Sequence, residues 1–372
     1  MYLFIRSSTN PGPRVSRIIN FFTSQDKKVR YLSPIRSGDP IAESVERLGD
    51  LGRFDYFDGN GYGKYLLFLL KTNIKTCIYL WKHRSELEFV HFSDLESVLL
   101  GGLFCKILNI KYIYNIHDNF FQRYAFNKML AAFLCRLESI FIRMSHKTLV
   151  PESFRRDAYP TSVHSRIEVL RNLPDFDVTT DRLPFTDSQV VLFYGGWISP
   201  NRNMDIYLTL ASYLISINKD VIVVMCGWGS EQYIQQLSHQ FESKGATFRY
   251  LGQLSQSDSV GYLKVADISI AHYSPDKIIN VFAASNKIPE IIGSNTILLT
   301  NAQTKMANEI LPYDISIQYE ASISETFEPL QRLIDDRQAL IEFIARANDY
   351  YQSNYNPRIT TNRMRELFDE YL

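Results

Sequence analysis

The hexapeptide Ser285-Asn286-Lys287-Ile288-Pro289-Glu290 lies between two apolar runs late in the chain, residues 265–271 and 296–300. Short apolar runs bounded by turn residues predict buried parallel strands, so the segment between them must form a loop and a short helix. A helix that begins after a parallel strand presents free backbone N–H groups and a positive dipole end, which suit a phosphate. Glu290, one turn into this helix, is placed to accept two hydrogen bonds from a ribose diol. The segment therefore predicts a nucleotide diphosphate site.

The same residues also fit a purely structural role. Ser285 and Asn286 are residue types that cap helices, and a carboxylate such as Glu290 favours the first helical turn. The choice between the two roles depends on the rest of the chain.

Strand-like runs alternate with helix-length amphipathic stretches along the whole sequence. This alternation predicts an α/β protein with parallel sheets, and 372 residues suit two domains of ordinary size. We predict two doubly wound, Rossmann-like domains that face a cleft, with ligands at the carboxyl ends of the strands. The predicted strands are 1–7, 28–33, 88–93, 111–116, 146–150, 189–195, 220–226, 246–251, 266–271, 296–300 and 314–318. The predicted helices are 13–25, 95–109, 124–144, 203–218, 229–243, 256–264, 286–292, 302–310 and 322–352.

The domain boundary is predicted near residue 174. The segment from Asn172 to Phe185 contains two prolines and several acidic and hydroxyl residues, a composition typical of linkers. We expect an N-terminal domain over 1–174, a linker over 175–188 and a C-terminal domain over 189–356.

The composition indicates a globular protein. Apolar residues make up 45% of the chain and charged residues 22%, and no apolar run approaches the roughly 18 residues that cross a bilayer. Four cysteines without paired spacing predict reduced thiols and a cytoplasmic location. The sequence contains no cysteine spacing typical of zinc or iron–sulfur sites, so no metal is expected.

The net charge of zero hides an asymmetry between the two halves. Residues 1–180 contain 25 Lys and Arg against 18 Asp and Glu, a balance of +7, and the remainder carries −7. A basic half suits an acidic partner, such as an anionic membrane surface or a phosphorylated acceptor, although such a balance is also ordinary for a domain of this size. No recognition motif supports nucleic acid as a partner.

Three further segments follow predicted strands at the edge where doubly wound domains bind ligands. The loop around Gly12 and Arg14 follows the first strand and is therefore a candidate ligand-binding loop. It lacks the G-x-G-x-x-G fingerprint, so NAD is not expected as its ligand. The alternative is a loop without a ligand, next to an exposed basic helix face. His117 and Asp118 form a histidine–carboxylate pair that can orient a tautomer, donate to a sugar hydroxyl or transfer a proton. The similar segment His91-Phe92-Ser93-Asp94 ends the neighbouring predicted strand.

Gly195 and Gly196 end another predicted strand and are followed by Arg202. Glycine lets a backbone approach a phosphate closely, and an arginine can neutralise a diphosphate with two hydrogen bonds. The pattern is no Walker motif, which argues against a P-loop kinase or ATPase. A second strand end, Cys226-Gly227-Trp228-Gly229, fits a tight turn beside the same site.

Taken together, these motifs resemble those of GT-B glycosyltransferases of the family 4 type, over most of the chain. Pro11-Gly12-Pro13-Arg14-Val15 resembles the D-P-R-V loop of that family. His91-Phe92-Ser93-Asp94-Leu95 resembles H-x-H-D-L, and Tyr114-Asn115-Ile116-His117-Asp118 resembles Y-D-x-H-E. The segment from Tyr194 to Asn203 resembles the donor loop, and Asn286-Lys287-Ile288-Pro289-Glu290 resembles P-N-K-x-x-E.

The resemblance implies a sugar-nucleotide donor, UDP- or GDP-linked, on the C-terminal domain and a glycan or lipid-linked acceptor on the N-terminal domain. It implies retaining, metal-independent transfer without a cofactor, in surface polysaccharide synthesis, and a final helix over 357–372 that crosses back to the N-terminal domain. The catalytic residues implied are His117, Asp118, Arg202 and Lys287. The donor-binding residues expected are Gly12, Arg14, Gly195, Gly196, Arg202, Gly252, Ser285, Asn286, Lys287 and Glu290.

Two positions depart from the family pattern, and two alternatives remain open. Phe282 stands where the family has its first glutamate, and Ser93 replaces the second histidine. A sugar-nucleotide epimerase of the same fold would need no acceptor. A catalytically inactive partner of another transferase would account for both departures. The aromatic and basic stretch 120–147 suits either transient contact with an anionic membrane or a helix packed on the core.

Overall fold

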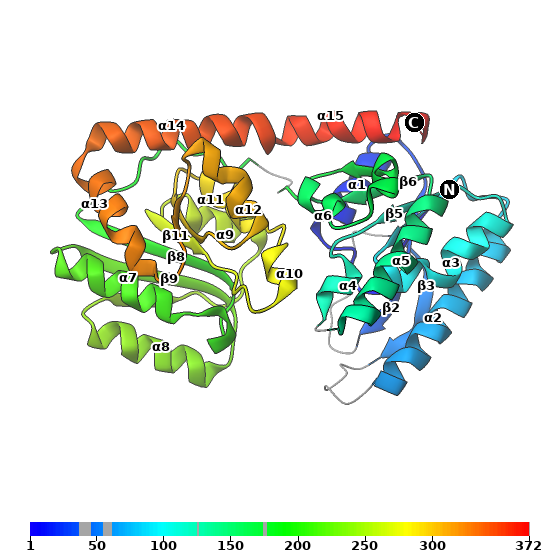
Figure 1. Ribbon diagram of the computed structural model, residues 1–372, viewed down its shortest axis with the longest axis horizontal. Helices are drawn as coiled ribbons and strands as arrows, with labels where there is room; N and C mark the ends of the chain where they lie inside the picture. The colour runs from blue at the N-terminus through cyan, green and yellow to red at the C-terminus, as the bar shows by residue number, and fades with distance from the viewer. Residues whose placement is uncertain (37–45, 55–61, 125, 174–176, 372) are drawn as a thin grey trace. The chain divides into compact units, whose positions relative to one another are not determined.

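The computed structural model describes residues 1–36, 46–54, 62–124, 126–173 and 177–371 (Figure 1). Two compact units divide the chain. Unit 1 comprises Met1–Asn172 together with Thr360–Leu372, and unit 2 comprises Leu173–Ile359. Each unit is a parallel sheet covered by helices, so the predicted α/β class with two doubly wound parts is confirmed.

Unit 1 contains a seven-stranded parallel sheet in the order β3-β2-β1-β4-β5-β6-β7. Its strands are β1 (Tyr2–Arg6), β2 (Val29–Arg36), β3 (Arg47–Phe54), β4 (Phe89–Ser93), β5 (Tyr112–Asn115), β6 (Lys147–Val150) and β7 (Ile167–Val169). The direction in which successive strands are added reverses between β1 and β4. In doubly wound sheets such a reversal leaves a crevice at the carboxyl edge where ligands bind.

The two faces of this sheet are covered by different helices because successive side chains of a strand point to opposite sides. Leu3 and Ile5 join one core with side chains of α2, α3 and α5, whereas Tyr2 and Phe4 join another with α1 and α15. The helices of the unit are α1 (Pro13–Thr23), α2 (Tyr62–His83), α3 (Leu95–Ile107), α4 (Phe120–Arg123), α5 (Lys128–Met144), α6 (Ser153–Asp157) and the 3-10 helix η1 (Thr161–Arg166).

The end of the chain packs on unit 1 through α15 (Pro357–Phe368) and η5 (Asp369–Tyr371). The ring of Phe368 lies 5.1 Å from that of Phe22, and the Tyr2 hydroxyl donates to the carbonyl of Tyr371 at 2.5 Å. Glu370 accepts from His146 at 2.7 Å and lies 3.0 Å from the Lys147 ammonium. These contacts attach residues 360–371 to the face that α1 covers.

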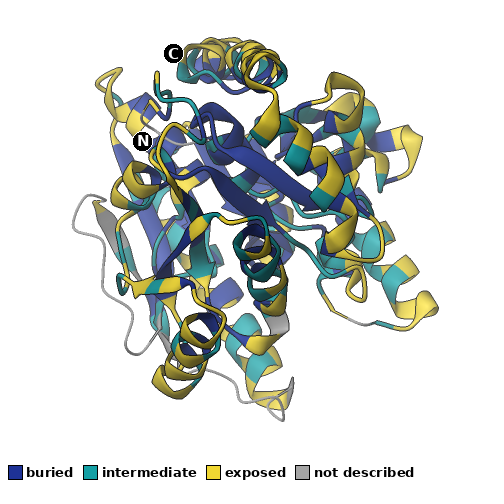
Figure 2. Ribbon diagram, turned by 90° about the vertical axis from the view of Figure 1, so that its left-hand side faces the viewer, coloured by how far each residue is buried: buried dark blue, intermediate teal, exposed yellow. Residues whose placement is uncertain are grey.

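Unit 2 contains a six-stranded parallel sheet in the order β10-β9-β8-β11-β12-β13. Its strands are β8 (Gln189–Trp197), β9 (Asp220–Trp228), β10 (Thr247–Tyr250), β11 (Ile268–Ala271), β12 (Ile297–Asn301) and β13 (Ile317–Tyr319). The strand order reverses between β8 and β11. Figure 2 shows the central strands mainly in the buried colour, with exposed residues on the outer faces of the helices.

The helices of unit 2 follow the strands in alternation. They are η2 (Pro200–Arg202), α7 (Asp205–Ser216), α8 (Glu231–Ser243), α9 (Gln256–Leu263), α10 (Ile278–Val281), α11 (Lys287–Gly293), α12 (Lys305–Ile310), η3 (Leu311–Tyr313), η4 (Ile323–Thr326), α13 (Phe327–Asp335) and α14 (Arg337–Asn354). The predicted helix over 322–352 is wrong as a single element. It divides at Asp336, whose carboxylate accepts from the backbone N–H groups of Gln338 and Ala339 and so begins a new helix.

Other predicted elements agree in type and differ at their ends. The helix predicted over 124–144 begins at Lys128, because the side chain of Asn127 accepts from the Leu130 N–H and caps it. The strands β3 and β7, the long helix α2 and the short helices α4, α6, α10, η1, η2 and η3 were not predicted. The first residues of the predicted linker, 175 and 176, lie outside the described residues. Its later part bonds to unit 2, as where Asp267 accepts from the Phe185 N–H at 2.7 Å.

Among the helices of the described ranges, none combines the length and the apolar character that a membrane span requires.

Candidate functional site

Two glycines on neighbouring strands shape the carboxyl edge of the unit 2 sheet. Gly196 of β8 pairs with Gly227 of β9, and their φ angles are +136° and +126°. A Cβ at Gly227 would lie 1.9 Å from the carbonyl oxygen of Gly196, so only glycine fits. A Cβ at Gly195 would lie 2.8 Å from the Ser259 hydroxyl. The predicted Gly195-Gly196 segment therefore allows backbone and neighbouring groups to approach closely.

A cavity of about 180 Å³ opens beside these glycines. The pairing of β8 with β11 ends at Phe193 and Ser269, so the last residues of β8 separate from those that follow β11. The cavity occupies the space between them. Its lining residues are Tyr194, Gly196, Trp197, Arg202, Asn203, Ile206, Tyr207, Trp228, Ile270, His272, Tyr273 and Lys287.

Arg202 and Lys287, both predicted, line this cavity from different elements. The Lys287 ammonium lies 4.0 Å from the centre of the Tyr194 ring, and the Arg202 guanidinium carbon lies 5.5 Å from the centre of the Trp197 ring. Burial, together with the positive charge of Arg202, lowers the pKa of Lys287 to about 8. Two cations that line one cavity and repel each other favour the binding of an anion there.

Glu290 lies one turn into α11 and is largely buried. Its Oε1 accepts from Gln256 Nε2 at 2.6 Å. Burial raises the pKa of Glu290 to about 7, although the hydrogen bond from Gln256 and the charge of Lys287 oppose the shift. A carboxylate in this state gains from a ligand that donates hydrogen bonds to its charged form.

The start of α11 is only partly capped by side chains. The Ser285 hydroxyl accepts from the Lys287 N–H at 3.1 Å, as the structural alternative predicted. Asn286 makes no such cap and has helical backbone angles, so a capping role for Asn286 is wrong. The Asn286 side chain is thereby left for another role.

The residues after β11 are held in place by the neighbouring strands. Tyr273 N–H donates to Asn301 Oδ1 and its carbonyl accepts from Asn301 Nδ2, both at 2.9 Å. His272 contacts the Tyr319 hydroxyl at 2.7 Å through Nδ1 and the Asn203 amide at 2.8 Å through Nε2. Burial lowers the pKa of His272 below its ordinary value. One wall of the cavity is therefore fixed by strand-end hydrogen bonds.

Gly252 lies in the loop after β10, outside the lining of the cavity. Its φ is +72°, and its carbonyl accepts from the Gly227 N–H at 2.8 Å. Gly252 is thus linked to the Gly196–Gly227 pair through the backbone. A Cβ at Gly252 would meet no atom within 4 Å, so the glycine serves the backbone conformation.

In unit 1, the predicted loop after β1 folds around arginine side chains. Gly12 has a φ of +75° and precedes α1, and Arg6 donates to the carbonyl of Pro11. Arg14 Nη2 donates to the carbonyl of Ile116 at 2.7 Å, and burial lowers the pKa of Arg14 to about 9. Arg14 and Arg17 are 2% and 8% exposed, so the alternative of an exposed basic face is wrong.

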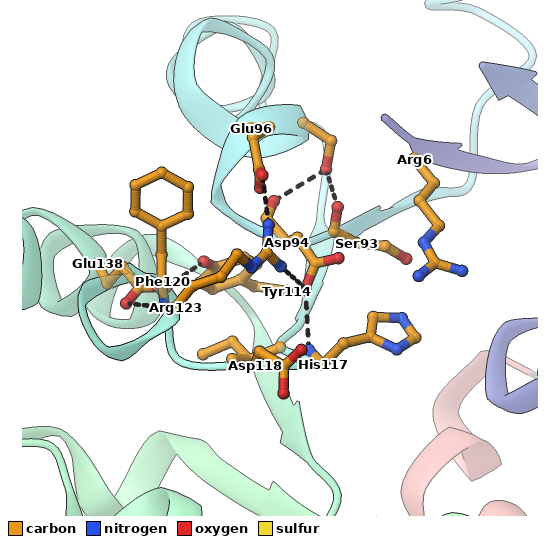
Figure 3. A network of polar contacts seen from close by, with 12 residues as sticks. Arg6, Ser93, Asp94, Glu96, Tyr114, His117, Asp118, Phe120, Arg123 and Glu138 are labelled. Atoms are coloured by element: carbon orange, nitrogen blue, oxygen red, sulfur yellow. Dashed lines mark hydrogen bonds and ion pairs between the residues drawn. The ribbon is translucent and has the colours of Figure 1, made fainter. Parts of the chain in front are cut away.

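A network of charged groups connects the ends of β4 and β5 (Figure 3). Asp94 Oδ1 accepts from the His117 N–H at 3.0 Å and lies 3.7 Å from Arg123 Nη2, while Arg123 Nη1 donates to Glu96 at 2.5 Å. Burial and the charge of Arg14 lower the pKa of His117 well below its usual range. His117 is therefore a neutral imidazole on a fixed backbone.

Asp118, predicted beside His117 as catalytic, has a structural partner. Its Oδ1 accepts from Arg155 Nη2 at 2.7 Å, and the Arg155 side chain is 1% exposed. His91 stacks on Phe4 at 4.7 Å between ring centres and is fully buried, and burial lowers its pKa to about 3. The two histidine–carboxylate segments thus lie at neighbouring strand ends, but His91 belongs to the core.

The predicted site residues fall into two groups. Unit 2 brings together Gly195, Gly196, Arg202, Ser285, Asn286, Lys287 and Glu290, with Gly252 attached through Gly227. Unit 1 holds Gly12, Arg14, His117 and Asp118 at the edge of its own sheet. The prediction missed His272, Tyr273 and Gln256. The position of His272 and Tyr273 directly after a predicted strand was a signal that could have found them.

Phe282 directly follows α10. It is the residue that stands where the family that the motifs resemble has its first glutamate. It is half-buried, and the Lys305 ammonium lies 5.8 Å from the centre of its ring.

No family model matches this sequence, and no curated protein matches it at the sequence level. Solved structures resemble the whole chain. Sucrose-phosphate synthase from Thermosynechococcus elongatus has a TM-score of 0.73 at 13% identity, over 100% of this chain and 99% of that one. Anabaena HepE in complex with UDP has a TM-score of 0.66 at 12% identity, over 99% of each chain. WaaG, a glycosyltransferase involved in lipopolysaccharide biosynthesis, has a TM-score of 0.64 at 12% identity, over 98% of this chain and 99% of that one.

Likeness at such low identity shows the fold. The chain has the GT-B fold, which confirms the fold that the motifs predicted. The family 4 assignment stays a prediction.

Proposed function

We propose that this protein is a glycosyltransferase that uses a nucleotide diphosphate sugar. The observation that supports this most directly is the set of charges around the cavity of unit 2. Two cations, Arg202 and Lys287, face it without a carboxylate partner among the ion pairs of the described residues, and Glu290 lies beside Lys287 with a raised pKa. This combination suits a diphosphate joined to a ribose.

The proposed donor roles follow from the positions of these groups. Arg202 and Lys287 would bind the diphosphate, and Glu290 would accept hydrogen bonds from the ribose diol. Gly195 and Gly196 would let the phosphates approach the backbone, with Ser285 and Asn286 at the start of α11. The loop at Gly252 would line the base. Gly12 and Arg14 of unit 1 are proposed to contribute to phosphate binding as well.

The proposed reaction transfers the sugar to a hydroxyl of a glycan or lipid-linked acceptor bound to unit 1. The bond from the anomeric carbon to the donor phosphate breaks, and a bond to the acceptor oxygen forms on the same face of the sugar. The acceptor proton passes to the departing phosphate oxygen. His117 would contact the transferred sugar, and Asp118 would hold this segment through Arg155. Arg202 and Lys287 would stabilise the negative charge of the leaving group without a metal.

The acceptor class, the retained configuration and a role in surface polysaccharide synthesis belong to this proposal through the motif resemblance. HepE binds UDP and, in other crystals, UDP-glucose, which makes a uridine donor the first to test. The proposal places the chain in the cytoplasm with transient contact to a membrane that carries the acceptor.

The first experiment measures donor binding by calorimetry with UDP-glucose, UDP and GDP. Glu290→Ala removes charge-assisted hydrogen bonds of about 1.5–3 kcal/mol each, so nucleotide affinity should fall about tenfold or more. Glu328→Ala, a change of the same type at an exposed helix position, should leave affinity unchanged. Equal affinity of wild type and Glu290→Ala would place the nucleotide elsewhere.

A second measurement separates the alternatives. Incubation with donor alone would yield an epimerised sugar nucleotide if the chain were an epimerase, whereas a transferase needs the acceptor. A chain that shows no melting shift with any nucleotide, and copurifies with another transferase, would be the inactive partner. A bound ligand at about 100 times its dissociation constant should add about 2.7 kcal/mol to the free energy of unfolding, which a melting curve detects.

A further inference from the structure

Helix α2 of unit 1 packs on the core with a face that combines polar residues with Leu80. Its buried face contains the polar residues Thr72, Asn73 and Thr76, and Asn73 bonds to α3 through the carbonyl of Glu96 at 2.9 Å and the N–H of Leu100 at 3.0 Å. The opposite face exposes large apolar side chains at helical spacing. These are Leu66, Leu67, Leu70, Ile74, Ile78 and Trp81, with exposed fractions from 46% to 65%. We call these six residues the α2 stripe.

A soluble helix normally turns its apolar side chains toward the core. The buried polar face of α2 is satisfied by hydrogen bonds, so the orientation of the helix is specified by its contacts with α3. The α2 stripe is therefore a feature of the folded unit, and contiguous exposed apolar surface of this kind marks an interaction site.

Cations run along the edge of the α2 stripe. Lys64, Lys71, Lys75 and Lys82 are all exposed on the same helix, and the Arg84 guanidinium lies 4.3 Å from the centre of the Trp81 ring. Lysine can extend its ammonium away from apolar surroundings while its methylene chain stays among them. A helix with apolar residues on one side and cations at the border suits the boundary between lipid tails and anionic headgroups.

Helix α3 packs beside α2, and α5 packs beside α3 (Figure 1), and both carry further exposed apolar and basic residues. Their exposed apolar residues are Leu100, Leu103, Ile107, Met129, Leu130, Phe133 and Ile140. Their exposed cations are Lys106, Lys128, Arg136 and Arg143. Among the described side chains of α2, α3 and α5 the only carboxylates are Glu96 and Glu138, and both are buried.

This charge pattern distinguishes between the partners that could cover an apolar surface. A second copy of the chain that used the same surface would bring two sets of cations together, which is unfavourable. A bilayer with anionic headgroups provides both the apolar interior and the opposite charge.

We propose that unit 1 docks on an anionic lipid bilayer through the α2 stripe, with the exposed residues of α3 and α5 at its margin. The proposal deepens the proposed function, on which it rests for the lipid-linked acceptor. It also assigns the main contact to α2, a helix that was not predicted from the sequence. The stretch 120–147, for which the sequence left membrane contact and core packing both open, contributes the exposed residues of α5 to the margin. Contact at α2 would keep the protein at the surface where such an acceptor lies.

Vesicle cosedimentation tests this assignment. The full chain should bind vesicles of phosphatidylcholine with phosphatidylglycerol at least about tenfold more tightly than vesicles of phosphatidylcholine alone. The variant Leu70→Gln/Ile74→Gln/Ile78→Gln should lose this binding, and Lys71→Glu/Lys75→Glu/Lys82→Glu should lose the preference for anionic lipid. These side chains are exposed, so the fold should persist, which a melting curve checks.

Matched controls keep the result specific. Val265→Gln/Leu311→Gln/Ile341→Gln replaces exposed apolar residues of unit 2 and should bind vesicles like wild type. Wild-type vesicle binding by the α2 stripe variant, or no binding by the wild type, would overturn the proposal. A dimer in sedimentation velocity that the stripe variant dissociates would show that a second copy covers the surface. UDP-glucose affinity, measured in the same samples, reports separately on the proposed function.

Discussion

The polar clusters at the edges of the two sheets differ in how their charges are compensated. In unit 1 two arginines have carboxylate partners: Arg123 pairs with Glu96 and Asp94, and Arg155 pairs with Asp118. The buried Arg14 bonds to the backbone carbonyl of Ile116. In unit 2 the cations Arg202 and Lys287 lie near aromatic rings and line the same cavity. Unit 1 therefore has a framework that its own residues stabilise, whereas unit 2 has a site whose charges favour an external anion.

This difference has a thermodynamic consequence. Groups that compensate one another within the protein contribute to stability and change little when a ligand binds, whereas groups with perturbed pKa values and no partner contribute to binding. Substitutions in unit 2 should therefore act on donor affinity, and substitutions in unit 1 should act on turnover or on stability.

The largest effect is expected from removal of both cations of unit 2. In Arg202→Ala/Lys287→Ala, loss of charge-assisted contacts of about 1.5–3 kcal/mol each should weaken UDP-glucose binding about a hundredfold or more. The control Lys244→Ala/Arg249→Ala removes two exposed cations of the same unit and should bind normally. Calorimetry measures the UDP-glucose affinity of both double variants. Unchanged affinity of Arg202→Ala/Lys287→Ala would mean that the cations of unit 2 do not bind the donor.

His117→Ala should affect the reaction and not the donor affinity. The imidazole lies on unit 1, and its proposed contact is with the transferred sugar, so turnover should fall about tenfold or more while UDP affinity stays near that of wild type. His239→Ala, an exposed histidine of α8, serves as the control in a coupled assay of UDP release. Wild-type turnover of His117→Ala would exclude this residue from the reaction.

The pH dependence of donor binding provides a sharper test of unit 2. Glu290, with a pKa of about 7, must ionise to accept hydrogen bonds from the ribose, so affinity should rise as pH increases toward 7. Lys287, with a pKa of about 8, must be protonated to bind the diphosphate, so affinity should fall above 8. Calorimetry with UDP-glucose should show highest affinity between these values and a decrease of about tenfold per pH unit outside them.

A variant and a contradicting outcome complete the test of this pH dependence. Glu290→Gln should lose the acid side of the curve and keep the alkaline side. A flat profile from pH 6 to 9 would mean that neither group changes its protonation when the donor binds.

The smallest effect should come from Asp118→Asn. Because Asp118 is partly exposed, loss of its charge beside the buried Arg155 should lower the free energy of unfolding by only about 1 kcal/mol. Urea denaturation measures this loss, and Asp157→Asn, an exposed carboxylate of the same unit, should show none. UDP affinity should not change, and a marked loss of affinity would place Asp118 in the donor site.

Much of the architecture follows from local patterns. Apolar runs such as those around Ile268 and Ile297 are long enough and regular enough to identify the buried strands. Failures occur where the pattern misleads. Helix α2 turns leucines outward and buries Asn73, so its apolar periodicity does not indicate its core face. The predicted helix over 322–352 missed Asp336, because a capping aspartate resembles any other polar residue until its hydrogen bonds are known.

The candidate site shows the same division. Gly196, Arg202, Lys287 and Glu290 could be predicted because each follows a strand in a motif of recognisable residue types. Gln256 could not be ranked above similar residues elsewhere, since its importance comes from a contact between distant segments. The Gln256–Glu290 hydrogen bond, for example, joins residues of α9 and α11.

The sequence by itself determined the α/β class, the doubly wound order of strands and the residue types at the strand ends, because these depend on local periodicity and on glycines at special backbone angles. Only the tertiary structure decided which charges are compensated. It paired Asp118 with Arg155, buried Arg14, left Arg202 and Lys287 facing one cavity and exposed the apolar side of α2. Burial and pairing depend on contacts between residues far apart in the chain, and these contacts set the pKa values and surfaces from which the function is proposed.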